Sequence, residues 1–400
     1  MDPALLGYVV EWLHLGVRWL HVIAAIAWVG ASFYFIALDY SLAPPDERDS
    51  AQGIGGESWE IHGGGFYRVQ KFRVAPSALP GSLRWFKWEA YTTWLTGFVL
   101  LVLLYYVDAG VTLVDPAVAA IDPPVAIAAS IGLIAVSWVA YDQLSRGLAA
   151  RPRALPIAVV LVVIVLTWIA VHLFSARAAY IEVGAAVGTW MAANVFFVII
   201  PGQRELVTAR QAGRDPDPRY GLEGKQRSIH NNYLTLPVLF AMISQHFPFT
   251  YSNPNAWLVL LGLMGVGGVV RHFFNLRHQG RLRWGVLAGA LLAALGLAAA
   301  MAPAPGSLAV GAGASDFTTV RNIVDSRCLV CHATAPAYPG VLTPPRGLTF
   351  DDPARIRAEA SSIYEQVVLT RHMPLRNATA MTDAERSVIG RWFQAGAPER

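Results

Sequence analysis

The dominant pattern along the chain is a series of long apolar runs separated by short polar connections. Residues 155–173, 257–270 and 286–302 contain almost no ionisable side chain. About 20 apolar residues in a helix match the hydrocarbon thickness of a bilayer. Pro and Gly lie at many borders of these runs, as at Pro201-Gly202, and are expected to end helices there. The pattern predicts eight membrane-spanning helices at roughly 12–42, 87–108, 120–145, 154–175, 180–201, 229–247, 255–275 and 283–302.

The connections between these runs differ in charge. Nearly all Lys and Arg residues before residue 303 lie in the loops after the first, third, fifth and seventh spans, whereas the short loops of the other set hold only Arg177. Basic residues accumulate on the cytoplasmic side of membrane proteins. We therefore expect both termini to lie outside the cytoplasm, and in a bacterium on the periplasmic side of the inner membrane.

The composition supports a membrane protein followed by a smaller soluble part. The chain has 400 residues, 54% of them hydrophobic and only 14% charged, with a net charge of +4. That charge reflects the loop asymmetry, so it does not indicate nucleic-acid binding. The expected fold class is all-α: a polytopic helix bundle at 1–303, a linker at 304–314 and a small domain at 315–400.

The small domain contains the only two cysteines. Cys328, Cys331 and His332 form a Cys-x-x-Cys-His motif, in which two thioethers attach a c-type haem and the histidine binds its iron. The alternatives are a chance match or a redox dithiol. The surroundings favour haem: a helix is expected at 317–327, a Pro/Gly-rich loop follows at 336–347, and Asp352-Pro353 is typical of a helix N-terminus.

The second axial ligand is expected some forty residues later. Met373 precedes Pro374, and Met/His ligation suits an electron acceptor. Met381 is the competing thioether, and His372 is expected to be a surface neighbour. Thr382 begins a capping box that opens a final helix. Covalent haem is attached outside the cytoplasm, which agrees with the orientation predicted from charge.

Ionisable residues inside spans are costly and usually functional. Glu11, His14, Arg18 and His21 share one face of the first span. Of these, His21 lies deepest, and His172 and His246 fall near the outer ends of other spans. Two of these three histidines could hold a membrane haem b. The alternative is that each is a hydrogen-bonded histidine within a helix bundle.

A second group of polar and aromatic residues is predicted on the inner side. It comprises Glu60, His62, Phe66, Tyr67 and Lys71 after the first span, Trp88, Glu89 and Tyr91 at the start of the second, His230, Asn231 and Asn232 at the sixth, and Arg271 at the seventh. Such aromatic residues ordinarily form an interfacial belt, and three consecutive glycines ordinarily form a turn. Together with amides, His and Arg, they also describe a pocket for a planar anionic heterocycle.

The same segments resemble the bacterial membrane-bound urate oxidase family, the PuuD-type urate hydroxylases. The matching stretches are RWLHVIAAIAWVGASFYF at 18–35, WEIHGGGFY at 59–67, WFKWEAYTTWLTG at 85–97, HNNYLTLPVLFAMIS at 230–244, RHFFN at 271–275, and the haem motif with its Met-Pro. The resemblance implies an eight-span domain fused to cytochrome c. It also implies oxidation of urate to 5-hydroxyisourate, with electrons passed to cytochrome c rather than to oxygen.

With urate as the substrate, we expect the following roles for the inner group, which the resemblance itself does not assign. Urate would enter from the cytoplasm, Arg271 or Lys71 would offset its charge, and Asn231 and Asn232 would bind its polar edge. Phe66, Tyr67, Trp88 and Tyr91 would pack against the ring. His62 or His230 would act as general base, because an unperturbed histidine suits proton transfer near neutral pH; Glu60 and Glu89 are alternatives.

The expected geometry raises a question of distance. An inner pocket and an outer haem would be about 30 Å apart, so either a second haem bridges them or the pocket lies deeper. Downstream partners would be another cytochrome c or a terminal oxidase. Two other functions remain open: a transporter fused to a cytochrome, and a quinol-oxidising electron-transfer protein. No dinucleotide or phosphate-loop motif is present to support NAD or flavin binding.

Overall fold

Long apolar helices make up most of the structure. The computed structural model describes residues 3–302, 316–339, 341 and 343–399, so the predicted linker at 304–314 lies outside the described residues. Within the described part, six helical stretches are long and apolar enough to cross a membrane. They are α1 (Pro3–Ser41), α3 (Trp88–Leu101) continued by η1 (Val102–Tyr106), α5 (Pro123–Gly147), α6 (Ala154–Leu173), α7 (Ala176–Ala193) continued by η2 (Asn194–Ile199) and α8 (Ile200–Gln211), and α11 (Ala256–His278).

The two remaining predicted spans also form helices, but of a different character. α9 (Pro218–Ile243) is 26 residues long, and its first half carries charged residues such as Arg219 and Lys225. α12 (Trp284–Ala300) is apolar but has only 17 residues. α9 packs against α7 and α11, and α12 packs against α11. The shorter helices of this part are α2 (Glu47–Ala51), α4 (Ala109–Thr112), η3 (Ser244–His246) and α10 (Pro248–Tyr251).

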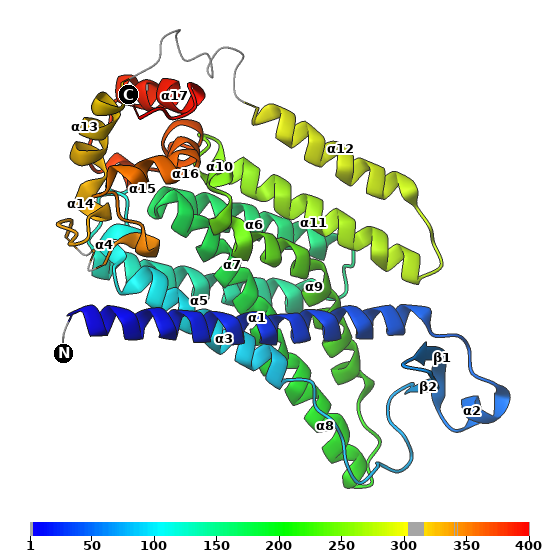
Figure 1. Ribbon diagram of the computed structural model, residues 1–400. Coiled ribbons are helices and arrows are strands. Elements are labelled where there is room, and N and C mark those ends of the chain that lie inside the picture. The colour runs from blue at the N-terminus through cyan, green and yellow to red at the C-terminus, as the bar shows by residue number, and fades with distance from the viewer. Residues whose placement is uncertain (1–2, 303–315, 340, 342, 400) are drawn as a thin grey trace.

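Pro201-Gly202 does not end a helix, contrary to the sequence prediction. The π-helical turn η2 directly precedes Pro201, and α8 continues to Gln211. A π-bulge rearranges the local hydrogen bonds, so a proline can follow without breaking the helix. α8 and the start of α9 consequently project together from the bundle as a long arm (Figure 1).

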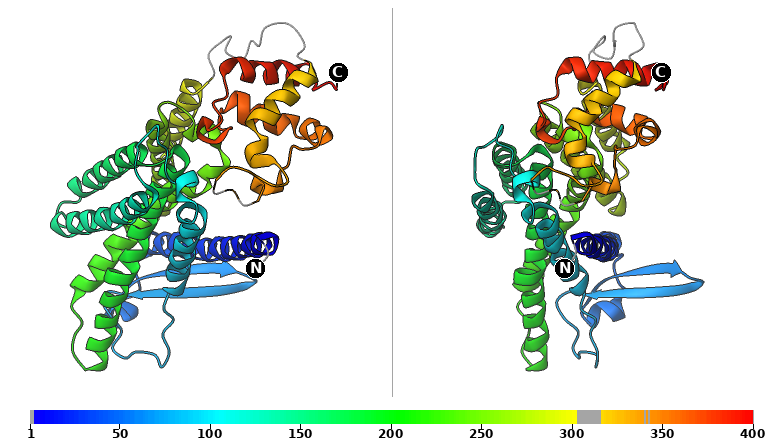
Figure 2. Two further views of the ribbon diagram at one scale, coloured as in Figure 1. Left: turned by 90° about the vertical axis from the view of Figure 1, so that its left-hand side faces the viewer. Right: turned by 60° about the vertical axis from the view of Figure 1, so that its left-hand side comes forward.

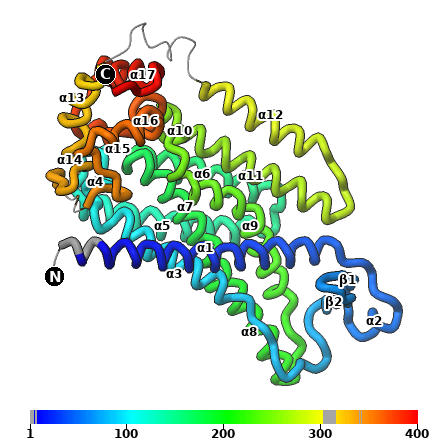
Figure 3. The backbone as a smooth tube through the Cα atoms, viewed as in Figure 1, coloured from blue at the N-terminus to red at the C-terminus, as the bar shows by residue number. Residues whose placement is uncertain are grey.

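α7 is the centre of the bundle. Thirteen of its 18 residues are buried, including Tyr180 and Trp190. Small residues allow close packing: a Cβ added at Gly184 would lie 2.8 Å from the Cβ of Ala241 on α9. Without a hydrophobic drive between helices in lipid, such close backbone approach is a main source of association. The tube in Figure 3 shows α7 surrounded by α5, α6 and α9.

The all-α prediction missed an antiparallel hairpin between α1 and α3. β1 (Ile54–His62) pairs with β2 (Gly65–Phe72), and Ile61 lies opposite Phe66. Gly63 and Gly64 form the two-residue turn with φ of +56° and +81°, which glycine adopts without strain. The expected glycine turn is therefore confirmed, but as the tip of a hairpin. The hairpin extends crosswise to the axis of α1 (Figure 2).

The C-terminal part is a small helical domain with its own core. Phe317, Val320, Ile389 and Trp392 are buried together. The expected helix at 317–327, the Asp352 cap and the capping box of Thr382 with Glu385 are all confirmed. Its elements are α13 (Phe317–Arg327), α14 (Leu329–His332), η4 (Pro345–Gly347), α15 (Pro353–Ala358), α16 (Ala360–Ile363), η5 (Tyr364–Leu369), η6 (Leu375–Asn377) and α17 (Asp383–Gln394).

The C-terminal domain sits at the end of the bundle where α1 begins (Figure 1). We call this the domain end, and the opposite end, where α1 meets β1 and β2, the hairpin end. Arg376 fixes the contact by donating hydrogen bonds to the carbonyl oxygens of Gly110 (2.9 Å) and Val114 (2.6 Å). The start of α1 and the C-terminal domain therefore share one end of the bundle.

Candidate functional site

The haem-attachment motif is held in a short helix with its histidine oriented. Cys328 caps α14, and Cys331 and His332 lie within it. His332 Nδ1 donates to the carbonyl of Leu348 at 3.0 Å, and the ring lies 5.1 Å from Phe350. Burial lowers the pKa of His332, which favours the neutral ring. A neutral histidine with Nδ1 bonded to a carbonyl presents Nε2 to a metal, so these residues fit a c-type haem.

The two candidate methionine ligands occupy different environments. Met373 is partly buried and packs, like Cys328, against the domain core. Its carbonyl accepts a hydrogen bond of 2.7 Å from Arg386. Met381 is only 3% exposed and belongs to the core itself. Met373 stays the predicted ligand, because it is only partly buried at the edge of the core, whereas Met381 is packed inside it.

His372 does not lie on a free surface as the sequence suggested. Its ring packs edge-on against Tyr251 of α10, with 5.4 Å between centroids. Burial lowers the pKa of His372 to about 4. His372 is therefore a neutral ring at the contact between the C-terminal domain and the bundle.

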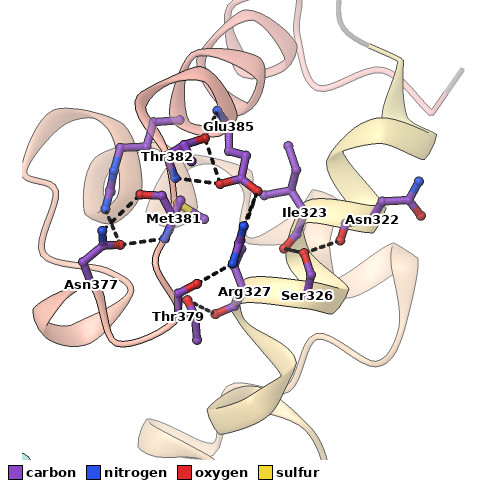
Figure 4. A network of polar contacts seen from close by, with 10 residues as sticks. Asn322, Ile323, Ser326, Arg327, Asn377, Thr379, Met381, Thr382 and Glu385 are labelled. Atoms are coloured by element: carbon purple, nitrogen blue, oxygen red, sulfur yellow. Dashed lines mark hydrogen bonds and ion pairs between the residues drawn. The ribbon is translucent and has the colours of Figure 1, made fainter.

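A polar network joins the helix before the haem motif to the first turn of α17 and the segment before it (Figure 4). Arg327 donates to Glu385 at 3.0 Å and to the carbonyl of Thr379 at 2.5 Å. Thr379 in turn donates to the carbonyl of Arg327. These contacts hold α13, and with it the first haem cysteine, against the C-terminal segment.

Replacing Cys328 and Cys331 with Ala is expected to abolish covalent haem, because both thioethers are lost. Intact mass after maturation with sufficient haem measures this. Met373→Leu should alter the ligand-sensitive absorption of the reduced haem, and Met381→Leu, the matched control, should leave it unchanged. The reverse result for the two methionines would reassign the axial ligand.

The three histidines proposed for a membrane haem b are separated in the fold. His21 of α1 bonds the carbonyl of Thr93 on α3 at 3.0 Å. His172 of α6 bonds the carbonyl of Trp168, one turn earlier in its own helix. His246 lies in η3. Membrane haem b stays an untested prediction.

A buried polar network lies inside the bundle around α9. Arg227 pairs with Asp142 of α5 at 2.6 Å, and the two side chains are only 3% and 5% exposed. Arg227 also donates to Asn194 Oδ1 at 3.2 Å. Asn194 Nδ2 then donates to Tyr141 (2.9 Å) and to Asn231 Oδ1 (2.8 Å).

This network fixes the role of His230. Guanidinium groups only donate, so Arg227 sets the orientation of the Asn194 amide, and the Tyr141 hydroxyl accepts from that amide. The hydroxyl proton is then directed to His230 Nδ1 at 2.9 Å. A neutral His230 therefore carries its proton on Nε2. Nε2 can donate a hydrogen bond to a substrate. It cannot act as a base, because it already carries a proton.

A second buried cluster lies beside the first. Asn232 Oδ1 accepts from Arg271 Nε and from Asn275 Nδ2, both at 2.9 Å. The Arg271 guanidinium lies 3.8 Å from the ring centroid of Phe33 on α1. Arg271 and Asn275 are 4% and 1% exposed, yet Arg271 Nη2 and Asn275 Oδ1 have no hydrogen-bond partner. A buried donor and a buried acceptor that both lack partners within one cluster make this cluster a candidate site for a bound polar molecule.

The hairpin residues predicted for the same pocket are placed differently. Glu60 accepts from Tyr34 of α1 at 2.8 Å, and Lys71 pairs with Asp39 of α1. Phe66 is 78% exposed near the hairpin tip. His62 and Tyr67 are likewise exposed. Glu60 and Lys71 therefore anchor the hairpin to α1, whereas the tip residues lie at the surface.

The predicted residues at the start of α3 form a third group. Trp88 packs against Tyr91, and Tyr91 packs against Phe196 of η2. Glu89 Oε2 is buried without a hydrogen-bond partner. An open hollow of about 450 Å³ is lined by residues 84–89. Of the four proposed bases, Glu89 is the one with a buried, unpartnered oxygen.

Several residues of these clusters are not predicted from the sequence. Asn275 stood within the RHFFN segment but was not assigned a role. The sequence pattern also does not single out Arg227, Asp142, Asn194 or Phe33 as site residues. Asp142 carried a usable signal, since a carboxylate within an apolar span is expensive unless it is paired.

Comparison with known families places the helix bundle in one family. A family model described as "Urate oxidase N-terminal" matches residues 7–302. The chain belongs to the urate oxidase N-terminal family. The match covers all the buried clusters described above and ends before the C-terminal domain. No curated protein and no solved structure matches the chain.

Proposed function

We propose that the protein oxidises urate to 5-hydroxyisourate at the Asn232, Arg271 and Asn275 cluster. The observation that carries this proposal is the pair of unpartnered atoms, Arg271 Nη2 and Asn275 Oδ1. Urate presents carbonyl oxygens next to ring N–H groups, and it is an anion at neutral pH. A guanidinium donor and an amide acceptor within one cluster supply the two kinds of group that such an edge needs, and membership of the family supports urate as the substrate.

Individual residues take the following roles in this proposal. Arg271 binds and neutralises the anion, and Asn275 accepts a ring N–H. Asn232 holds both side chains through its amide oxygen. His230 donates from Nε2, because Tyr141 occupies Nδ1. Glu89 is the proposed base that takes a proton while the ring is oxidised.

The electrons are proposed to leave through the C-terminal domain. A haem bound to Cys328, Cys331, His332 and Met373 supplies a one-electron acceptor. In the same proposal the chain crosses a bacterial inner membrane eight times, with α9 and α12 as the sixth and eighth spans. The C-terminal domain then faces the periplasm, where another cytochrome c or a terminal oxidase accepts the electrons.

Anaerobic mixing of purified haem-loaded protein with urate tests this function. We expect the c-haem alpha band to become reduced, and 5-hydroxyisourate to form at one molecule per two electrons delivered. Ascorbate serves as the control that the haem is reducible. A band that stays oxidised with urate but is reduced by quinol would replace the proposal with quinol oxidation. If neither donor reduces the haem, a transporter function would be favoured.

A further inference from the structure

The proposed urate site and the C-terminal domain lie far apart along the bundle. Arg271 is fifteen residues beyond Ala256, where α11 begins. At 1.5 Å per residue this separation is about 22 Å. Asn232 is eight residues before Phe240 on α9, a separation of about 12 Å. Electrons released at the site must therefore cross the half of the bundle next to the domain end.

A continuous set of aromatic ring contacts occupies that half. Phe240 of α9 contacts Tyr180 of α7, with 6.4 Å between centroids. Tyr180 contacts Tyr251 of α10 at 5.9 Å. Tyr251 contacts His372 of the C-terminal domain at 5.4 Å. His372 directly precedes Met373, the predicted iron ligand.

Hydrogen bonds and burial fix the rings in place. The Tyr180 hydroxyl donates to the carbonyls of Ala256 (2.6 Å) and Thr250 (3.0 Å). Tyr180 is fully buried and Tyr251 is 3% exposed. On the other side of the contact, Arg376 clamps the loop after Met373 onto Gly110 and Val114. The ring contacts therefore lie at a largely buried contact that hydrogen bonds hold on both sides.

Resting on the function proposed above, we infer that electrons leave the bundle along Phe240, Tyr180, Tyr251 and His372. The rings provide closely spaced polarisable groups through which each electron passes, and none of them is permanently oxidised. Urate and water yield 5-hydroxyisourate, two protons and two electrons. The two electrons cross one at a time, and an external c-type cytochrome or oxidase removes each from the haem before the next arrives.

This inference makes a membrane haem b unnecessary. The four rings form an unbroken series of contacts from α9 to the C-terminal domain. The contact between Tyr251 and His372 is the only step in that series that crosses between the two domains. It is therefore the step to test.

Tyr251→Leu and Tyr251→Phe form a matched pair for the test. Leucine removes the ring, whereas phenylalanine keeps it and loses only the hydroxyl. After anaerobic mixing with urate, we expect haem reduction to slow at least about tenfold in Tyr251→Leu, equivalent to about 1.4 kcal/mol in the barrier. Tyr251→Phe should remain close to the unmodified protein. The haem midpoint potential, and hydrogen exchange at residues 110–114 as a report on docking, should not change.

A second electron donor separates this inference from the urate proposal. Both natural cysteines are used by the haem, so Ile243→Cys, at an exposed position three residues after Phe240, offers a single thiol for a ruthenium photosensitiser. Flash-induced haem reduction should depend on the Tyr251 ring in the same way. Equal rates for the leucine and phenylalanine variants, with docking intact, would overturn the inference. Ring-dependent flash reduction without reduction by urate would instead retain the path and discard urate as the donor.

Discussion

Replacing Arg271 with Met is expected to lower kcat/KM for urate by at least about 100-fold, or roughly 3 kcal/mol of transition-state binding. The substitution keeps much of the side-chain volume but removes the charge and the unpaired Nη2 that is proposed to bind the anion. Steady-state oxidation of urate with an artificial acceptor measures the effect. The kcat/KM of Arg271→Lys should lie between those of the unmodified protein and Arg271→Met, because lysine restores the charge without the planar guanidinium.

Two controls accompany this substitution. Arg277 lies on the same helix but is exposed, so Arg277→Ala should leave kcat/KM within a factor of about two. Covalent haem content should be unchanged in every variant, since the haem motif lies in another domain. If Arg271→Met retained full activity while binding haem normally, the Asn232, Arg271 and Asn275 cluster would not be the urate site.

Asp142→Asn is expected to destabilise the bundle by about 3–5 kcal/mol, because it leaves the buried Arg227 without its counter-charge. Arg227 and Asp142 are almost completely buried, so water cannot screen the remaining charge. Thermal unfolding in detergent, followed by tryptophan fluorescence, measures the loss.

Arg146→Ala is the matched control for the buried pair. Arg146 also pairs with Asp142, at 2.7 Å, but its own side chain is 56% exposed. Exposed ion pairs contribute at most about 1 kcal/mol, and Asp142 keeps Arg227 in this variant. Equal effects of Asp142→Asn and Arg146→Ala would show that burial of the Arg227 pair does not govern stability.

The pattern of apolar residues predicted most of the helices, because in each helix the apolar side chains continue over many turns. In the small C-terminal domain, two helix starts were predicted to the exact residue, because capping depends on residues close in the sequence. These are the starts at Asp352 and Thr382. The hairpin was not predicted because few of its strand residues are buried, and because it contacts α1. One of these contacts is the hydrogen bond from Tyr34 to Glu60.

The candidate site was harder to predict, for a physical reason. Sequence alone places residues on helices, but it does not give the contacts between helices. Asn231 and Asn232 are adjacent, yet Asn231 joins the Asn194 network, whereas Asn232 holds Arg271 and Asn275. Likewise, the choice of the His230 ring nitrogen that carries the proton depends on a chain of polar contacts. That chain starts at Asp142, 88 positions earlier in the sequence.

The attachment of the C-terminal domain through Arg376 has an evolutionary consequence. Its two acceptors are main-chain carbonyl oxygens of Gly110 and Val114, which every amino acid supplies. Substitutions in that loop can therefore accumulate without loss of the joint, provided that the loop keeps its shape. A foreign C-terminal domain bearing an arginine at the equivalent position would meet the same acceptors, so the joint itself places little restriction on the sequence of the bundle loop.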